Sequence, residues 1–123
     1  MEGSPIVRLT GVYNADTGLV GEARYLLEKL TGRASCALCD ITHGTSIRDK
    51  TAWRRCRAAL PVPFAIYHRN DQPSDLADFT PGLLPCVVAH HETGELSLAV
   101  TAQQLSDCDH HVDALEKLLL KLL

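Results

Sequence analysis

The segment PFAIYH, residues 63–68, places the strongest constraint on the fold of this chain. It is a continuous apolar run, too short for a helix and bounded by proline and by the polar stretch RND, so it predicts a short buried strand. A first strand is predicted at residues 6–13, which favour strand structure and end at the turn-like NADTG. The connection between these strands is long enough for a parallel crossover, which would be right-handed.

Two helices are predicted within that connection. Leucines and alanines recur at helical spacing over residues 19–30. A second helix is predicted over residues 49–60, where an apolar stripe includes Trp53 and Cys56 and where Pro61 ends the helix. The stripe indicates that this helix packs one side against the core and exposes its arginines to solvent.

The second half of the chain predicts a loop, a hairpin and a closing helix. Residues 70–85 hold three prolines and a glycine, which indicates a loop with a single helical turn at SDLADF. PCVVAHH and LSLAVT flank the turn ETGE and predict a β-hairpin. From about Asp107 an amphipathic helix is predicted to run to the end of the chain.

This order of elements predicts one α/β domain spanning residues 1–123. A chain of 123 residues is the usual size of a single domain and can bury one core without metals or structural disulfides. A parallel pair of strands followed by a hairpin and a helix predicts a sandwich with a mixed sheet of about four strands and helices on both faces.

Charge and segment composition limit the partners and the compartment. The net charge is -3, so no global basic field attracts nucleic acid or an anionic membrane. The first residues lack the pattern of a secretory signal, and no apolar run approaches the roughly 20 residues that span a bilayer. We therefore expect a cytoplasmic protein that binds neither nucleic acid nor membrane. Its five cysteines would be free thiols there, unless they bind metal or perform chemistry.

The stretch CALCDITH, residues 36–43, carries the main candidate site. Two residues between Cys36 and Cys39 allow their sulfurs to approach closely enough for a disulfide or for two corners of a tetrahedral metal site. As a redox pair, the more exposed cysteine would attack and the other would resolve the mixed disulfide, with His43 or the following helix stabilising a thiolate.

Two alternatives to redox chemistry stay open for this stretch. In a zinc or other soft-metal site, Cys36, Cys39 and His43 would supply three ligands, and water or a further Cys or His would supply the fourth. Standard zinc motifs have a second pair of ligands at a defined spacing, and this sequence has none. Alternatively the cysteines are structural, because cysteine behaves as a small hydrophobic residue.

Other polar clusters have simpler interpretations. Cys56 lies among arginines, which could activate its thiol, but helical spacing favours packing of Cys56 in the core. The histidine pairs in AHHE and DCDHH suggest metal ligands, yet adjacent histidines point in different directions, so surface or helix-cap roles are expected. Asn14 in NADTG either shapes the turn or orients a ligand.

The string LLPCVVAHHETGELSLAV, followed by TAQQL and a terminal helix, resembles the closing half of the thioredoxin-like fold. In that fold a cis-proline opens a strand, a charged turn with glycine makes the hairpin, and a helix packs across the sheet. The resemblance implies that Pro85 is the cis-proline, that Cys86 is a third thiol near the active face, and that Asn14 occupies the active-site turn. The fold's usual CxxC would lie in that turn, whereas here it follows the first predicted helix.

The chain also resembles a group of small bacterial proteins with a VYNA start, a CxLC pair followed by Thr and Gly, and a later Trp. Here these features are VYNAD, CALCDITHG and Trp53. Such proteins are sometimes labelled GTPases, but a phosphate-binding loop needs Gly-Lys-Ser/Thr at its end, and GVYNADTG is followed by Leu19.

The function expected from the sequence is therefore thiol redox or thiol transfer through Cys36 and Cys39, in the manner of a thiol-disulfide oxidoreductase. Its partner would be a protein or small-molecule thiol or disulfide. Binding of zinc through Cys36, Cys39 and His43, and an interaction domain with structural cysteines, are the alternatives.

Overall fold

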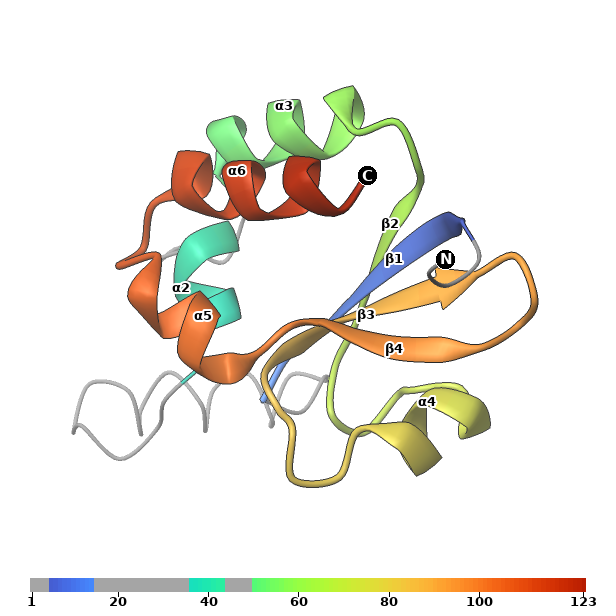
Figure 1. Cartoon of the computed structure of the whole chain (residues 1–123). Coiled ribbons are helices and arrows are strands. Elements are labelled where there is room, and N and C mark those ends of the chain that lie inside the picture. Colours follow the sequence, from blue (N-terminus) through green and yellow to red (C-terminus); the bar gives the residue numbers. More distant parts are fainter. Residues whose placement is uncertain (1–4, 15–35, 44–49) are drawn as a thin grey trace, which may run out of the picture.

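A four-stranded mixed sheet forms the centre of the computed structural model, which describes residues 5–14, 36–43 and 50–123 (Figure 1). The strand order is β2-β1-β3-β4. The first two strands pair in parallel, and β3 is antiparallel to both of its neighbours. The predicted α/β class with a mixed sheet is confirmed, as is the parallel crossover. The strands are β1 (Ile6–Val12), β2 (Phe64–Tyr67), β3 (Cys86–His91) and β4 (Leu96–Val100).

Helices cover both faces of this sheet, as predicted (Figure 1). On one side, α3 contacts α6 and α2 contacts both α5 and α6. On the other side lies the short α4, at the predicted helical turn SDLADF. The helix predicted over residues 19–30 lies outside the described residues. The described helices are α2 (Ala37–Thr42), α3 (Thr51–Ala59), α4 (Ser74–Phe79), α5 (Ala102–Asp107) and α6 (Val112–Leu122).

Side chains on the two faces of the central strands β1 and β3 fill two separate cores. Leu9 of β1 and Val87 of β3 pack in the larger core beneath α2, α3, α5 and α6. Val12 and Val88, on the opposite side of the same strands, pack in the smaller core with Leu76 of α4. Because side chains of a strand alternate between faces, β1 and β3 can be buried on both sides without a change of register.

Helix α2 approaches β1 very closely at Gly11. A Cβ atom added to Gly11 would lie 3.0 Å from a methyl carbon of Leu38 and 3.0 Å from the ring of Phe64. Since so short a contact requires a neighbour to move, glycine at this position allows the helix that carries the cysteine pair to rest directly on the central strand.

The C-terminal helix begins later than predicted, and a short helix that was not predicted precedes it. Helix α5 begins after Thr101, whose side chain forms a capping box with Gln104. Asp109 and His110 then adopt positive φ angles of 49° and 68°, a conformation that interrupts a right-handed helix. The second helix therefore begins at Val112, and the prediction of a start near Asp107 is wrong.

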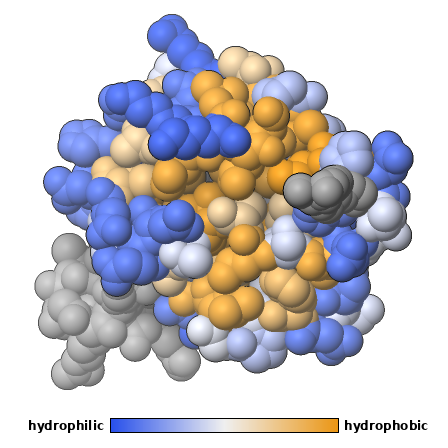
Figure 2. Space-filling model, in the orientation of Figure 1, coloured by the Kyte–Doolittle hydropathy of each residue, from blue (hydrophilic) through white to orange (hydrophobic). Residues whose placement is uncertain are grey.

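The surface in the orientation of Figure 1 is partly hydrophobic. Figure 2 shows hydrophobic residues across much of this face, with hydrophilic residues at its margins. Large hydrophobic side chains that are exposed within the described residues include three leucines near the end of the chain, Leu120, Leu122 and Leu123. Every helix in the described part of the chain is too short or too polar to span a bilayer.

His90 is buried in the sheet, contrary to the surface position expected for it. Its side chain is 6% exposed, and Arg8 Nη2 lies 3.0 Å from its Nδ1. Because arginine can only donate, Nδ1 accepts, and the imidazole Nε2–H donates to Thr10 Oγ1 at 2.7 Å. This pair of hydrogen bonds requires the neutral imidazole. Burial lowers the pKa of His90, with Arg8 and His91 acting in the same direction and Asp75 opposing them.

Replacing His90 by Gln should therefore reduce the loss of stability in mild acid. With its pKa lowered in the native state, His90 binds fewer protons than in the unfolded chain, so the free energy of unfolding falls as pH drops through the window below about 6.5. Urea unfolding at about pH 7.5 and about pH 5.5 measures this slope. His111→Gln, which changes an exposed histidine, is the control, and an unchanged slope in His90→Gln would contradict the assignment.

Candidate dithiol site

Cys36 and Cys39 form a disulfide where α2 begins. Their Cα atoms are 5.3 Å apart, within the ordinary range for a bridged pair. Cys36 immediately precedes the helix and Cys39 lies in its first turn, so the two-residue spacing brings the sulfurs together locally. The sequence-based prediction that these side chains can approach within bonding distance is confirmed.

Backbone amides hold the sulfur of Cys36. The N–H of Asn14, just beyond the end of β1, donates to Cys36 Sγ at 3.4 Å. The N–H of Cys39 donates to the same sulfur at 3.3 Å. Cys36 is 1% exposed and Cys39 is 8% exposed, so the two cysteines differ in access as well as in hydrogen bonding.

A cluster of three polar side chains closes the other end of α2. The buried Tyr13 hydroxyl lies 2.6 Å from Thr42 Oγ1 and 3.2 Å from His43 Nδ1. Thr42 Oγ1 also lies 2.9 Å from His43 Nδ1. The backbone N–H of His43 donates to the Cys39 carbonyl at 2.8 Å, which places His43 one helical turn after Cys39.

Thr42 also contacts the backbone of its own helix. Its Oγ1 lies 3.1 Å from the Leu38 carbonyl, a common arrangement inside helices. In the 2.6 Å contact between Tyr13 and Thr42 either hydroxyl can donate, and the role of His43 Nδ1 follows its tautomer.

Tyr13 also connects this cluster to the end of β2. Its ring makes edge-to-face contacts with His68 at a centroid distance of 5.2 Å and with His43 at 5.8 Å. His68 Nδ1 is 3.5 Å from Asp71 Oδ2. Sequence reasoning missed Tyr13, Thr42 and His68. The position of two of these residues in the chain could have indicated them. Tyr13 and His68 directly follow the two predicted parallel strands, and the carboxyl ends of parallel strands meet at one edge of a sheet.

The three proposed zinc ligands do not converge in this disulfide-bonded state. Among the described residues, no group of three or more His, Cys, Asp or Glu side chains is arranged to hold a metal ion, and Cys36, Cys39 and His43 all belong to this part of the chain. His43 Nδ1 instead contacts Tyr13 and Thr42. The geometry thus adds no support to a metal site.

The other predicted site residues lie in different surroundings. Asn14 contacts the disulfide through its backbone, and the Leu84–Pro85 bond is cis, as the resemblance implies. Cys86 is fully buried in the smaller core, on the face of the sheet opposite Cys36. Burial raises the pKa of the Cys86 thiol to about 11. We therefore assign Cys86 to packing rather than to ligand contact.

The remaining two free cysteines are also buried thiols. Burial, followed by the charge and hydrogen bond of Glu116, raises the pKa of Cys56 to about 11. Burial, followed by the charge of Asp107, raises the pKa of Cys108. The arginines beside Cys56 are exposed, so helix α3 has the solvated basic side that its spacing predicts, and Cys56 packs inward with Trp53.

Comparisons with protein-family models, with curated proteins and with solved structures found no match to this chain.

Replacing Tyr13 by Phe should destabilise the fold by about 1–2 kcal/mol, because it removes the hydroxyl that hydrogen bonds to Thr42 inside a buried polar cluster. Chemical denaturation followed by far-ultraviolet circular dichroism measures the change. Tyr67→Phe, in a half-buried tyrosine of β2, serves as the control. Equal stability of Tyr13→Phe and the wild-type chain would show that the cluster contributes nothing to the fold.

Proposed function

We propose that this chain is a thioredoxin-like protein that exchanges disulfides with a protein or small-molecule thiol through Cys36 and Cys39. The observation that carries the proposal is the asymmetry of the pair. Two backbone N–H groups point at Cys36 Sγ, while Cys39 is the more exposed cysteine. Thiol-disulfide exchange needs one sulfur that is attacked and one that leaves, and the smaller burial of Cys39 and the donors at Cys36 fit these two roles.

The arrangement of the second half of the chain supports the thioredoxin-like part of this proposal. Strand β3 begins directly after Pro85, and Gly94, with a φ of 91°, lies in the turn between β3 and β4. Helix α6 packs against β4 and α3. These are the features on which the sequence resemblance rests, now placed together in one sheet with its helices.

In the reductive direction, a partner thiolate attacks Cys39 Sγ. The bond between Cys36 and Cys39 breaks, and Cys36 leaves as a thiolate with the electron pair of that bond. The N–H groups of Asn14 and Cys39 then donate to a full negative charge, which strengthens these hydrogen bonds.

The second step completes the exchange. A second partner thiolate attacks the partner sulfur of the mixed disulfide and releases Cys39 as a thiolate. The partner dithiol has then lost two electrons to form a disulfide, and Cys36 and Cys39 have gained them and take up two protons from solvent. Reversal of the same steps oxidises this chain.

The three buried thiols are poor competitors in this chemistry. At neutral pH the thiolate is the nucleophile, and the raised pKa of Cys56 and of Cys86, each about 11, keeps both protonated. The raised pKa of these thiols therefore leaves the pair at α2 as the site of the proposed exchange.

The oxidation state of the purified chain gives the first test. Native mass spectrometry without chelator or reductant should give a mass lower by two hydrogens than the reduced chain, restored by mild reduction and absent in Cys36→Ser and in Cys39→Ser. Cys86→Ser is the matched control and should keep the disulfide. A bound metal ion lost in Cys36→Ser would favour the metal site instead, and a fully reduced mass under oxidising conditions would favour structural cysteines.

The order of attack can be tested by trapping the mixed disulfide. With bis(2-hydroxyethyl) disulfide, reduced Cys36→Ser should form an adduct at Cys39 at least about tenfold faster than reduced Cys39→Ser forms one at Cys36, because exchange depends on access to the sulfur. Intact-mass time courses on folded variants give both rates. A faster reaction at Cys36 would reverse the assigned roles of the two cysteines.

A further inference from the structure

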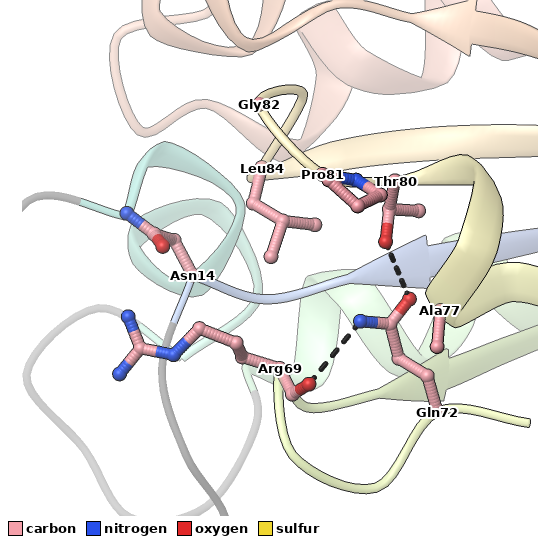
Figure 3. A pocket seen from close by; sticks show the side chains of 8 residues that line it. All are labelled: Asn14, Arg69, Gln72, Ala77, Thr80, Pro81, Gly82 and Leu84. Carbon is pink, nitrogen blue, oxygen red and sulfur yellow. Dashed lines mark hydrogen bonds between the residues drawn. The ribbon is translucent and has the colours of Figure 1, made fainter. Parts of the chain in front are cut away.

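A surface hollow of about 470 Å³ lies beside the carboxyl ends of the two parallel strands (Figure 3). It is bordered by the residue that follows β1, by the segment between β2 and α4, and by the segment that leads into β3. This volume is within the range of sites that hold small molecules. The lining residues are Asn14, Arg69, Gln72, Ala77, Thr80, Pro81, Gly82 and Leu84.

The lining combines an apolar floor with polar groups at both sides. Leu84 points its side chain into the middle of the hollow, while the Arg69 guanidinium and the Asn14 amide lie on one side and the Gln72 amide on the other (Figure 3). Ala77 and Pro81 add further apolar surface. A ligand that fits this arrangement has a short apolar body and an anionic end.

Gln72 is held in place before any ligand arrives. Buried Thr80 donates through Oγ1 to Gln72 Oε1 at 2.8 Å, and Gln72 Nε2 donates to the Arg69 carbonyl at 3.2 Å. A primary amide has two N–H donors and a carbonyl oxygen with two lone pairs, so one donor and one acceptor direction remain after these bonds. Preorganised polar groups bind with less loss of conformational freedom.

Asn14 joins this hollow to the dithiol site. Its side chain lines the hollow, and its backbone N–H donates to Cys36 Sγ. Reduction of the disulfide would place a thiolate against the same residue, and an anion in the hollow would then be repelled by it. The oxidised chain should therefore bind an anionic ligand more tightly than the reduced chain.

We propose that this hollow is a binding site for a small organic carboxylate with a short branched apolar body, and that the ligand binds preferentially to the disulfide form. Arginine recognises carboxylate through parallel hydrogen bonds, and Leu84 offers the apolar contact. By linkage, a ligand that prefers the oxidised chain stabilises its disulfide against reduction by the same factor. Only this redox preference rests on the proposed exchange function.

The carboxylate site is tested with 4-methylpentanoate on the oxidised full-length chain, followed by amide and methyl NMR shifts. Saturable shifts are expected at Asn14, Gln72 and Leu84, with affinity reduced about tenfold for 4-methylpentanamide and for Arg69→Gln, as loss of a charge-assisted contact implies. Arg55→Gln, an exposed arginine of α3, should bind like the wild-type chain.

A second variant controls for an indirect effect of the Arg69→Gln substitution on the shape of the hollow. Ala77→Glu places a carboxylate on exposed helix surface at the rim of the hollow and should also abolish binding by repulsion, with a preserved amide spectrum showing that the chain is folded. Absence of saturable shifts, or equal affinity for the acid and its amide, would overturn the carboxylate site.

The redox preference is tested by repeating the titration after reduction with dithiothreitol at about pH 8, near the ordinary pKa of a cysteine thiol. The reduced wild-type chain should bind at least about threefold more weakly, and Cys36→Ser/Cys39→Ser, which has no thiolate there, should bind like the oxidised chain. Equal affinity of the two redox forms would overturn the preference. If no disulfide forms but Arg69-dependent binding persists, the exchange function fails and the carboxylate site stands.

Discussion

The burial of the second half of β1, Leu9 to Val12, on both faces is the constraint on which the rest of this structure depends. The strand pairs with β2 on one side and with β3 on the other, so its backbone is satisfied along most of its length. Its side chains alternate between two cores that are closed by different helices. A shift of register by one residue would exchange the two sets of side chains and expose Leu9 and Val12 to the wrong packing partners. The position of the strand end, and thus of Tyr13 and Asn14, is fixed by this double burial.

The dithiol site depends on that fixed strand end. Asn14 reaches Cys36 through its backbone, and Tyr13 reaches Thr42 and His43 through its hydroxyl, so the two residues that follow β1 hold α2 at both ends. Gly11 lets the same helix lie against β1. Hydrogen bonds and close packing therefore attach the helix at the cysteine pair to the central strand.

Sequence patterns predicted the layers of the fold because apolar periodicity reports burial directly. The strands, the helix containing Trp53 and the CxxC spacing are local features, and the sheet class follows from the lengths of the connections.

The contacts of the site could not be predicted in the same way. Tyr13 and His43 are separated by 30 positions, and their contact depends on how α2 crosses β1. His90 was expected at the surface because adjacent histidines point in different directions, and its partner Arg8 lies 82 positions away along the chain. The break near Asp109 rests on a backbone conformation that non-glycine residues seldom adopt.

Backbone N–H donors, and not burial, separate Cys36 from the three free cysteines. Burial is the first cause of the raised pKa of Cys56, Cys86 and Cys108. Cys36 is as buried as they are, yet two backbone N–H groups point at its sulfur, and such donors compensate a thiolate for lost water. The solvent exposure of the sulfur alone would therefore not identify Cys36 as a sulfur that can carry charge. In the proposed exchange, the backbone N–H groups of Asn14 and Cys39 distinguish the leaving sulfur from the other buried sulfurs, so the end of β1 takes part in the proposed chemistry.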